Sequence, residues 1–166
     1  RPAPPRPSPA ARRPEVIYRA IVKRKARGIF AALSRGDVEA VSADLADDVH
    51  HVFAGDNALG GERHSRAAFE QWLQRLHRLI PEIEFEVLDV AVRGWPWDTA
   101  VAIEWIDRGK GADGTPYVNQ GAHWIRLRWG KGIEVHGYLD TEKVTRLLDD
   151  MAAAGIKEAA APPITG

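Results

Sequence analysis

The sequence predicts an α+β fold in which helices come first and an antiparallel sheet follows. Apolar residues recur at helical spacing up to residue 80, and from residue 82 they alternate in runs rich in Val, Ile and aromatic residues. Because helices and strands are segregated along the chain, we expect an antiparallel meander and not a doubly wound parallel sheet. The length of 166 residues and the hydrophobic content of 45% fit one domain with a substantial core.

The first half of the chain predicts three helices. Apolar residues between Ile17 and Leu33 share one helical face, and Gly36 supplies a helix end. Asp37 can cap a short second helix. Ser65 can cap a third, which carries a regular apolar stripe and which Pro81 ends.

Five strands are expected, separated by turns rich in Gly, Asp and Pro. They cover residues 50–54, 83–93, 99–108, 117–129 and 133–140. Asp140 or Thr141 then caps a final helix, which Gly155 ends. The order helix, helix, strand, helix, four strands and helix defines the predicted architecture.

The chain divides into three predicted parts. Residues 1–14 contain six prolines and four arginines, and we expect a disordered tail there, because Pro lacks a backbone N–H and little apolar surface is available to bury. Residues 15–155 form the α+β domain, and residues 156–166 form a C-terminal tail. Removing the four arginines from a net charge of zero leaves the rest of the chain at −4.

The composition argues against several classes of function. The 23 basic and 23 acidic residues balance, so we expect no nucleic-acid partner and no membrane partner. No apolar run approaches the roughly 20 residues that cross a bilayer. Cysteine is absent, which removes disulfides and thiolate metal sites and fits a cytoplasmic protein.

Two local patterns resemble binding motifs without meeting their structural requirements. Gly109 to Gly114 match G-x-G-x-x-G, but a strand follows where a dinucleotide site needs a helix, so a hairpin turn is predicted and no cofactor is expected. His50 and His51 are adjacent on a strand and point to opposite faces. We therefore expect no metal site from this pair.

Three segments resemble SnoaL-like proteins of the nuclear transport factor 2-like superfamily. They are Phe30–Asp37 (FAALSRGD), Leu45–Val49 (LADDV) and Gly130–Asp140 (GKGIEVHGYLD), and the likeness covers about residues 16–155. The resemblance implies a cone: a strongly curved antiparallel sheet wrapped around a pocket and closed by the N-terminal helices. The superfamily includes polyketide cyclases, limonene-epoxide hydrolases, ketosteroid isomerases and scytalone dehydratase, and also binding modules without chemistry, so function must be argued from the site.

The chain departs from the catalytic patterns that the resemblance implies. Cyclases and epoxide hydrolases of this kind carry an aspartate on the last strand, and this chain has Gly137 there. The hydrolases also use an Arg and an Asp, two residues apart, where this chain has Glu104 and Ile106. Neither chemistry carries over directly.

Alignment with the catalytic members of the family also selects the strand faces that line the pocket. The side chains expected inside are His51, Phe53, Trp72, Leu76, Glu104, Ile106, Asn119, His123, Val135 and Leu139. Seven of them, without His51, Glu104 and His123, are expected to bind the substrate. Since a slip of one residue turns every side chain of a strand over, His136 and Tyr138 are the alternative inward pair.

Glu104, His123 and His51 are the expected proton-transfer groups. Desolvation raises the pKa of a carboxyl group and a neighbouring imidazolium lowers it, so a Glu–His pair in an apolar stretch suits acid–base work near neutral pH. The same residues are compatible with structural hydrogen bonds.

Two functions remain open. The first is a cofactor-independent isomerase, cyclase or dehydratase that acts on a small hydrophobic molecule. The second is a non-catalytic ligand-binding or accessory module with the same fold. A homodimer is also expected, because the strand faces assigned to the outside carry Val101, Ile103, Trp105, Trp124 and Tyr138.

Overall fold

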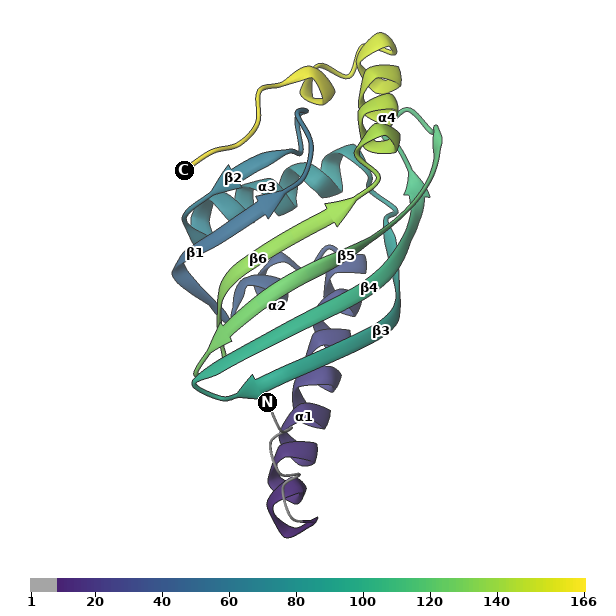
Figure 1. The fold of residues 1–166 in the computed structure, drawn as a ribbon. Helices are drawn as coiled ribbons and strands as arrows, with labels where there is room; N and C mark the ends of the chain where they lie inside the picture. Colours follow the sequence, from purple (N-terminus) through teal and green to yellow (C-terminus); the bar gives the residue numbers. More distant parts are fainter. Residues whose placement is uncertain (1–8) are drawn as a thin grey trace, which may run out of the picture.

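The computed structural model describes residues 9–166, with side chains from Pro14 onward. One curved sheet of six strands has helices packed on one face (Figure 1). In chain order the elements are α1 Pro9–Ser34, α2 Val38–Ser42, β1 Leu45–Phe53, β2 Gly61–Arg63, α3 Arg66–Leu79, β3 Glu84–Trp95, β4 Asp98–Lys110, β5 Pro116–Arg128, β6 Lys131–Leu139, α4 Thr141–Ala153 and the 3₁₀ helix η1 Lys157–Ala160. The predicted α+β class is confirmed.

The strand order in the sheet is β2-β1-β6-β5-β4-β3. Strands β3 to β6 form the expected antiparallel meander, and β1 pairs with β6 in parallel, so the sheet is mixed. Strand β1 begins five residues before the predicted start, and the three-residue strand β2 was not predicted. Strand β2 is hard to predict because its three residues are too few for an alternating pattern to distinguish them from a loop.

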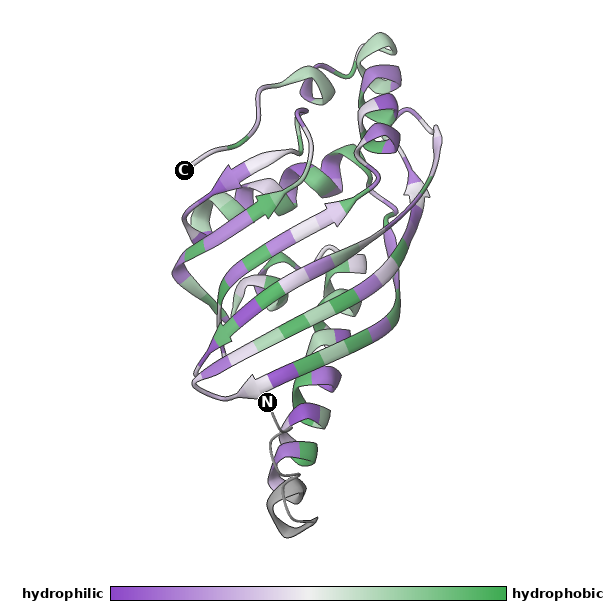
Figure 2. Cartoon of the chain, in the orientation of Figure 1, coloured by the Kyte–Doolittle hydropathy of each residue, from purple (hydrophilic) through white to green (hydrophobic). Residues whose placement is uncertain are grey.

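Three helices begin directly after the capping residues that the sequence predicts. Asp37, Ser65 and Asp140 each accept a hydrogen bond from a backbone N–H in the first turn of α2, α3 and α4. Helices α1, α2 and α3 lie behind the sheet as drawn, and α4 packs at one end of it (Figure 1). Along the strands, hydrophobic and hydrophilic residues alternate (Figure 2). The apolar members face the helices, and the core therefore lies between these helices and the concave face of the sheet.

The chain ends differ from the prediction of two tails. Helix α1 begins at Pro9, within the segment predicted to be disordered, because Ala10 and Ala11 favour a helix and Pro is tolerated in a first helical turn. The remainder of that predicted tail, residues 1–8, lies outside the described residues. Within residues 9–166, no helix combines the length and apolarity of a bilayer span.

The segment after α4 packs onto the domain instead of forming a tail. Ala159 is buried, and Glu158 pairs with Arg78 at 2.6 Å. Further along, Arg75 Nη1 donates to the Pro162 carbonyl oxygen at 2.8 Å. These contacts hold residues 156–166 against the outer side of α3.

Candidate functional site

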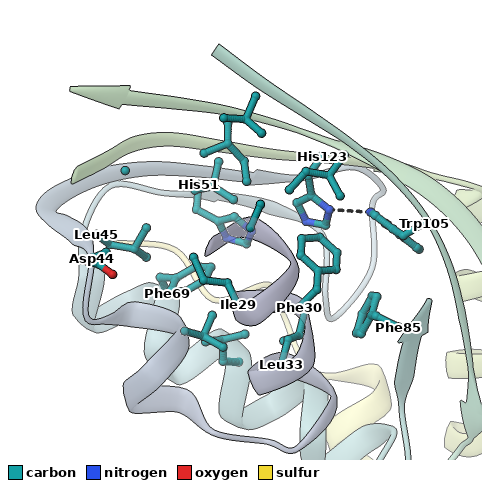
Figure 3. Close-up of a pocket in the computed structure, with 18 of the residues that line it drawn as sticks. Ile29, Phe30, Leu33, Asp44, Leu45, His51, Phe69, Phe85, Trp105 and His123 are labelled. Carbon is teal, nitrogen blue, oxygen red and sulfur yellow. Dashed lines mark hydrogen bonds between the residues drawn. The ribbon is translucent and has the colours of Figure 1, made fainter. Parts of the chain in front are cut away.

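A cavity of about 410 Å³ lies between the concave face of the sheet and helices α1 and α3. Its wall is mostly apolar, and the polar side chains that the sheet contributes include His51 on β1, Asp107 on β4 and His123 on β5. Figure 3 shows that two of them, His51 and His123, face the same space from neighbouring parts of the sheet. A volume of this size accommodates a small organic molecule.

The mouth of the cavity lies beside α1 and the turns at one end of the sheet. Lining residues there are exposed, among them Ile21 at 50%, Trp129 at 71% and Lys25, whose side chain is 46% exposed. Lys25 Nζ lies 2.8 Å from Asp44 Oδ2, so an ion pair spans part of the rim. Exposed aromatic and charged side chains thus surround the entrance.

The register of β4 against β5 overturns the expected position of Glu104. Ile103 lies opposite His123, and Glu104 lies opposite Ala122. Directly opposed residues share a sheet face, so His123 points inward with Ile103 while Glu104 points outward and is exposed. Glu104 and His123 therefore cannot form the expected acid–base pair.

The error lay in which alternating set of β4 faces inward. The inward set is Val101, Ile103, Trp105 and Asp107, which is the set assigned to the outside in the sequence analysis. Ile106 lies on the outer face with Glu104 and is half-buried. Hydrophobicity was the missed signal, because Val, Ile and Trp form a more apolar set than Ala, Ala and Glu.

Most of the other expected pocket residues line the cavity. They are His51, Phe53, Trp72, Leu76, His123 and Val135. Leu139 instead packs, half-buried, against the core. The alternative pair fails as well, because His136 and Tyr138 lie on the outer face, where Tyr138 is 54% exposed.

Asn119 is buried but does not line the cavity. Its Nδ2 donates to the Tyr117 hydroxyl and to the Asp140 carbonyl oxygen, both at 3.0 Å, and its Oδ1 accepts from the Gln120 N–H at 2.8 Å. With these groups paired, Asn119 joins β5 to the start of α4 and is not free to bind a ligand.

The hydrogen bond from Trp105 defines the state of His123. Trp105 Nε1 donates to His123 Nδ1 at 2.7 Å, and an indole nitrogen can only donate (Figure 3). Burial lowers the pKa of His123 to about 4, so the ring is neutral at pH 7. Because Nδ1 accepts, the proton of the neutral ring sits on Nε2.

His51 has the same arrangement with a different partner. Arg63 Nη1 donates to His51 Nδ1 at 3.2 Å, and arginine can only donate. Burial, and then the charge of Arg63, hold the pKa of His51 well below its ordinary value. Its Nε2 is buried and finds no hydrogen-bond partner among the residues that the structure describes. His51, which also lines the cavity, is therefore a second neutral ring with its proton on Nε2.

Arg63 is a site residue that the sequence analysis missed. Its side chain is fully buried, donates to the Gly61 carbonyl at 3.1 Å and to the carbonyls of Leu59 and Gly60, and packs on the Trp72 ring at 5.5 Å. Burial lowers its pKa to about 10, so it stays charged at pH 7. Its only sequence signal is a charge within the unpredicted strand β2.

Asp107 is the second missed residue, and it is the acid that faces inward from β4. It lines the cavity at 3% exposure, and within the described part of the chain its Oδ1 has no hydrogen-bond partner. Burial raises its pKa to about 6 against the lowering effect of hydrogen bonds from its surroundings. Burial, and then the charge of Asp107, raise the pKa of Tyr117 beside it.

The acid and the histidine donors occupy different parts of the cavity. Asp107 is four residues along β4 from Ile103, which lies opposite His123. Four residues of a strand span about 13 Å. One ligand can therefore contact both regions only if it is elongated.

Comparison with known proteins agrees with this architecture. A family model described as a SnoaL-like domain matches residues 26–135, well over half of the chain. The chain belongs to the SnoaL-like family. This confirms the resemblance seen in the sequence. No curated protein matches the sequence significantly.

Several solved structures share the fold. An NTF2-like protein of unknown function from Burkholderia pseudomallei has 20% identity and a TM-score of 0.67, over 75% of this chain and 94% of that one. PrhC from Penicillium brasilianum has 14% identity and a TM-score of 0.69, over 82% and 91%. A ketosteroid isomerase-like protein from Catenulispora acidiphila, in complex with trimethylamine, has 19% identity and a TM-score of 0.63, over 83% and 97%. At these identities the likeness concerns the fold.

Proposed function

We propose that this SnoaL-like protein binds a small, mostly apolar molecule through an oxygen atom of that molecule. The observation that carries the proposal is that two neutral histidine rings, His51 and His123, line a mostly apolar cavity with the ring proton on Nε2, and that Nε2 of His51 has no hydrogen-bond partner among the described residues. A buried donor without a partner is costly, and a carbonyl, ether or hydroxyl oxygen would satisfy it. The trimethylamine complex of a protein with this fold supports small-molecule binding in general.

The protonation of the two rings favours binding over base catalysis by histidine. On each ring, the nitrogen that could accept a proton already accepts a hydrogen bond, from Trp105 in one case and from Arg63 in the other. Both pKa values are lowered, so neither ring is an imidazolium at neutral pH. The histidines therefore serve as fixed hydrogen-bond donors.

A matched pair of probes tests the proposal without knowledge of the natural ligand. Fluorene and 9-fluorenone have nearly the same shape and differ by one carbonyl oxygen, and quenching of tryptophan fluorescence reports their binding. We expect the ketone to bind about tenfold more tightly, the gain of one or two net hydrogen bonds. Equal affinity for the two probes would contradict the proposal.

Variants assign the preference to the donors. In His123→Asn, the Asn oxygen can still accept from Trp105 Nε1, but the Nε2–H is lost. His51→Asn does the same beside Arg63. We expect the preference for the ketone to shrink in each single variant and to vanish in the double variant. If it persists in the double variant, the histidines do not hold the oxygen.

Asp107 favours a second candidate function, cofactor-independent acid–base catalysis of the isomerase, cyclase or dehydratase type. Its pKa of about 6 lets it exchange a proton near neutral pH, at the part of the cavity remote from the histidines. Exchange of the α-protons of 2-tetralone in D₂O, followed by NMR, measures such transfer. A catalytic Asp107 predicts acceleration by the protein and a loss of at least about 100-fold in Asp107→Asn. If the protein does not accelerate this exchange, the catalytic proposal is refuted and the binding proposal stands.

We also propose that the chain forms a homodimer through the outer face of the sheet. Val101, Ile103 and Trp105 do not contribute, because they face the core, but Val118, Trp124 and Tyr138 are between 40% and 54% exposed on that face. A patch of this kind typically marks a partner surface. Light scattering at micromolar concentration should give twice the chain mass, and Tyr138→Arg should give the monomer mass. A monomer before substitution would contradict the dimer.

A further inference from the structure

Three side chains that can ligate a metal gather on the outer face of the sheet, away from the cavity. His50 lies on β1, Glu62 on β2, and His64 directly after β2. In the β1–β2 ladder His51 is opposite Arg63, and both of these side chains are buried on the inner side. Since side chains alternate along a strand, His50, Glu62 and His64 share the outer face.

The distances within this cluster are close to those of a metal site. His50 Nε2 lies 3.0 Å from Glu62 Oε2, and His64 Nε2 lies 3.8 Å from the same oxygen. All three ligand atoms lie within 4.8 Å of one another. Zinc bonds of about 2.0–2.1 Å in a tetrahedron separate the ligand atoms by roughly 3.4 Å. The two measured distances lie on either side of that value.

The two imidazole rings of the cluster are already arranged side by side. The rings of His50 and His64 are stacked with centroids 4.7 Å apart and planes inclined by 8°. Both Nε2 atoms therefore approach one carboxylate from the same side of the hairpin. Ligation by one ion would need only small rotations of these partly exposed side chains.

A third histidine supplies an independent observation. The ring of His136, on β6, lies 5.1 Å from that of His50. Its Nε2 is buried and has no hydrogen-bond partner among the described residues. Three protein ligands leave the fourth tetrahedral position open, and a water on the metal there would give His136 Nε2 a partner.

We propose that His50, Glu62 and His64 form a binding site for one divalent transition-metal ion of the zinc class. Imidazole and carboxylate ligands suit Zn²⁺, whereas Mg²⁺ and Ca²⁺ prefer oxygen ligands alone. From the sequence no metal site is expected, because His50 and His51 point to opposite faces of their strand. That geometry holds, but the β1–β2 hairpin brings His50 to Glu62 and His64 instead.

The site would also fix a residue that supports the cavity wall from behind. Arg63 lies between the two ligands Glu62 and His64 in the chain, and its side chain points inward to His51. Strand β2 is a short edge strand with three paired residues. A metal bridge from β2 to β1 would hold this edge and thereby the position of Arg63. The metal would thus stabilise the hairpin without entering the cavity.

Calorimetric titration of ZnCl₂ into the tag-free, EDTA-treated full chain tests the proposal. We expect one ion per chain with a dissociation constant of about 10 µM or lower. At a hundredfold excess of zinc over that constant, Tm should rise by about 5–10 °C. Absence of saturable binding below about 100 µM would overturn the proposal.

Single substitutions locate the ion. His50→Ala, His64→Ala and Glu62→Gln should each weaken zinc binding at least about tenfold, while their far-UV spectra and Tm without zinc stay close to those of the parent. His77→Ala, at a histidine on α3, and Glu134→Gln, at a nearby carboxylate paired with Arg126, are matched controls that should bind zinc unchanged. Zinc binding that survives all three ligand substitutions would refute the assignment.

Discussion

Replacing Asp107 by Asn should stabilise the protein at neutral and higher pH. The folded protein raises the pKa of this carboxyl from 3.8 to about 6, because burial disfavours its charged form. Since each pKa unit corresponds to 1.36 kcal/mol, a rise of roughly two means that keeping Asp107 ionised lowers the free energy of unfolding by about 3 kcal/mol. Asn keeps the shape of the side chain and carries no charge, so it removes this cost.

The effect has a defined pH window and sign. Between pH 4 and 6 the folded state holds more protons at Asp107 than the unfolded state does, so the contribution of Asp107 to stability falls as pH rises through that range. Asp107→Asn and the parent should therefore be nearly equal in stability at pH 4. At pH 8 the variant should be more stable by about 3 kcal/mol, which raises Tm by about 6–12 °C.

Urea unfolding of both proteins at several pH values between 4 and 8 measures this difference. The buried histidines also make stability depend on pH, but they are the same in both proteins and cancel in the comparison. A variant that is less stable than the parent at pH 8 would refute the reasoning. It would mean that the ionised carboxylate has favourable partners in the folded protein.

Three further predictions concern the cavity and the chain end. Because the folded pKa of His123 is about 4, this one residue should cost the parent about 3 kcal/mol as pH falls from 6.5 to 4, so in urea unfolding the stability of His123→Asn relative to the parent should rise by that amount over this range. In Gly137→Ala, the new Cβ would lie 3.1 Å from Phe53 Cδ2 and 3.2 Å from His123 Nε2, so 9-fluorenone should bind more weakly while the circular dichroism spectrum is kept. Deleting residues 157–166 removes the buried Ala159 and should lower Tm by about 4–8 °C, and an unchanged Tm would show that this segment adds nothing.

The sequence carries most of the fold because its strongest signals are local. Caps at Asp37, Ser65 and Asp140 and the change of apolar period place α2, α3, α4 and the four long strands within a few residues. The positions of β1 and β2 depend on pairing between strands instead: β2 pairs with β1 in antiparallel, and β1 pairs in parallel with the distant β6. Three residues of alternation do not distinguish a strand from a loop.

The candidate site was predicted only in part, for a reason that lies in one strand. The side chains of β1 and β5 were placed on the correct face, which brings His51 and His123 to the cavity. For β4, alignment with the catalytic members of the family selected the wrong alternating set, although the greater hydrophobicity of Val101, Ile103 and Trp105 favours the other one. Because of this single choice, Glu104 is predicted as the inward acid, whereas in the structure Asp107 faces the cavity.

Long-range ¹H–¹⁵N NMR of the imidazole nitrogens tests the central claim, that the cavity offers two neutral hydrogen-bond donors. The spectrum separates the two neutral tautomers from the imidazolium, and His51→Asn and His123→Asn assign the signals. At pH 7, both rings should be neutral with the proton on Nε2, and His123 should remain so until the pH approaches 4. A proton on Nδ1 of either ring, or an imidazolium at pH 7, would contradict the account.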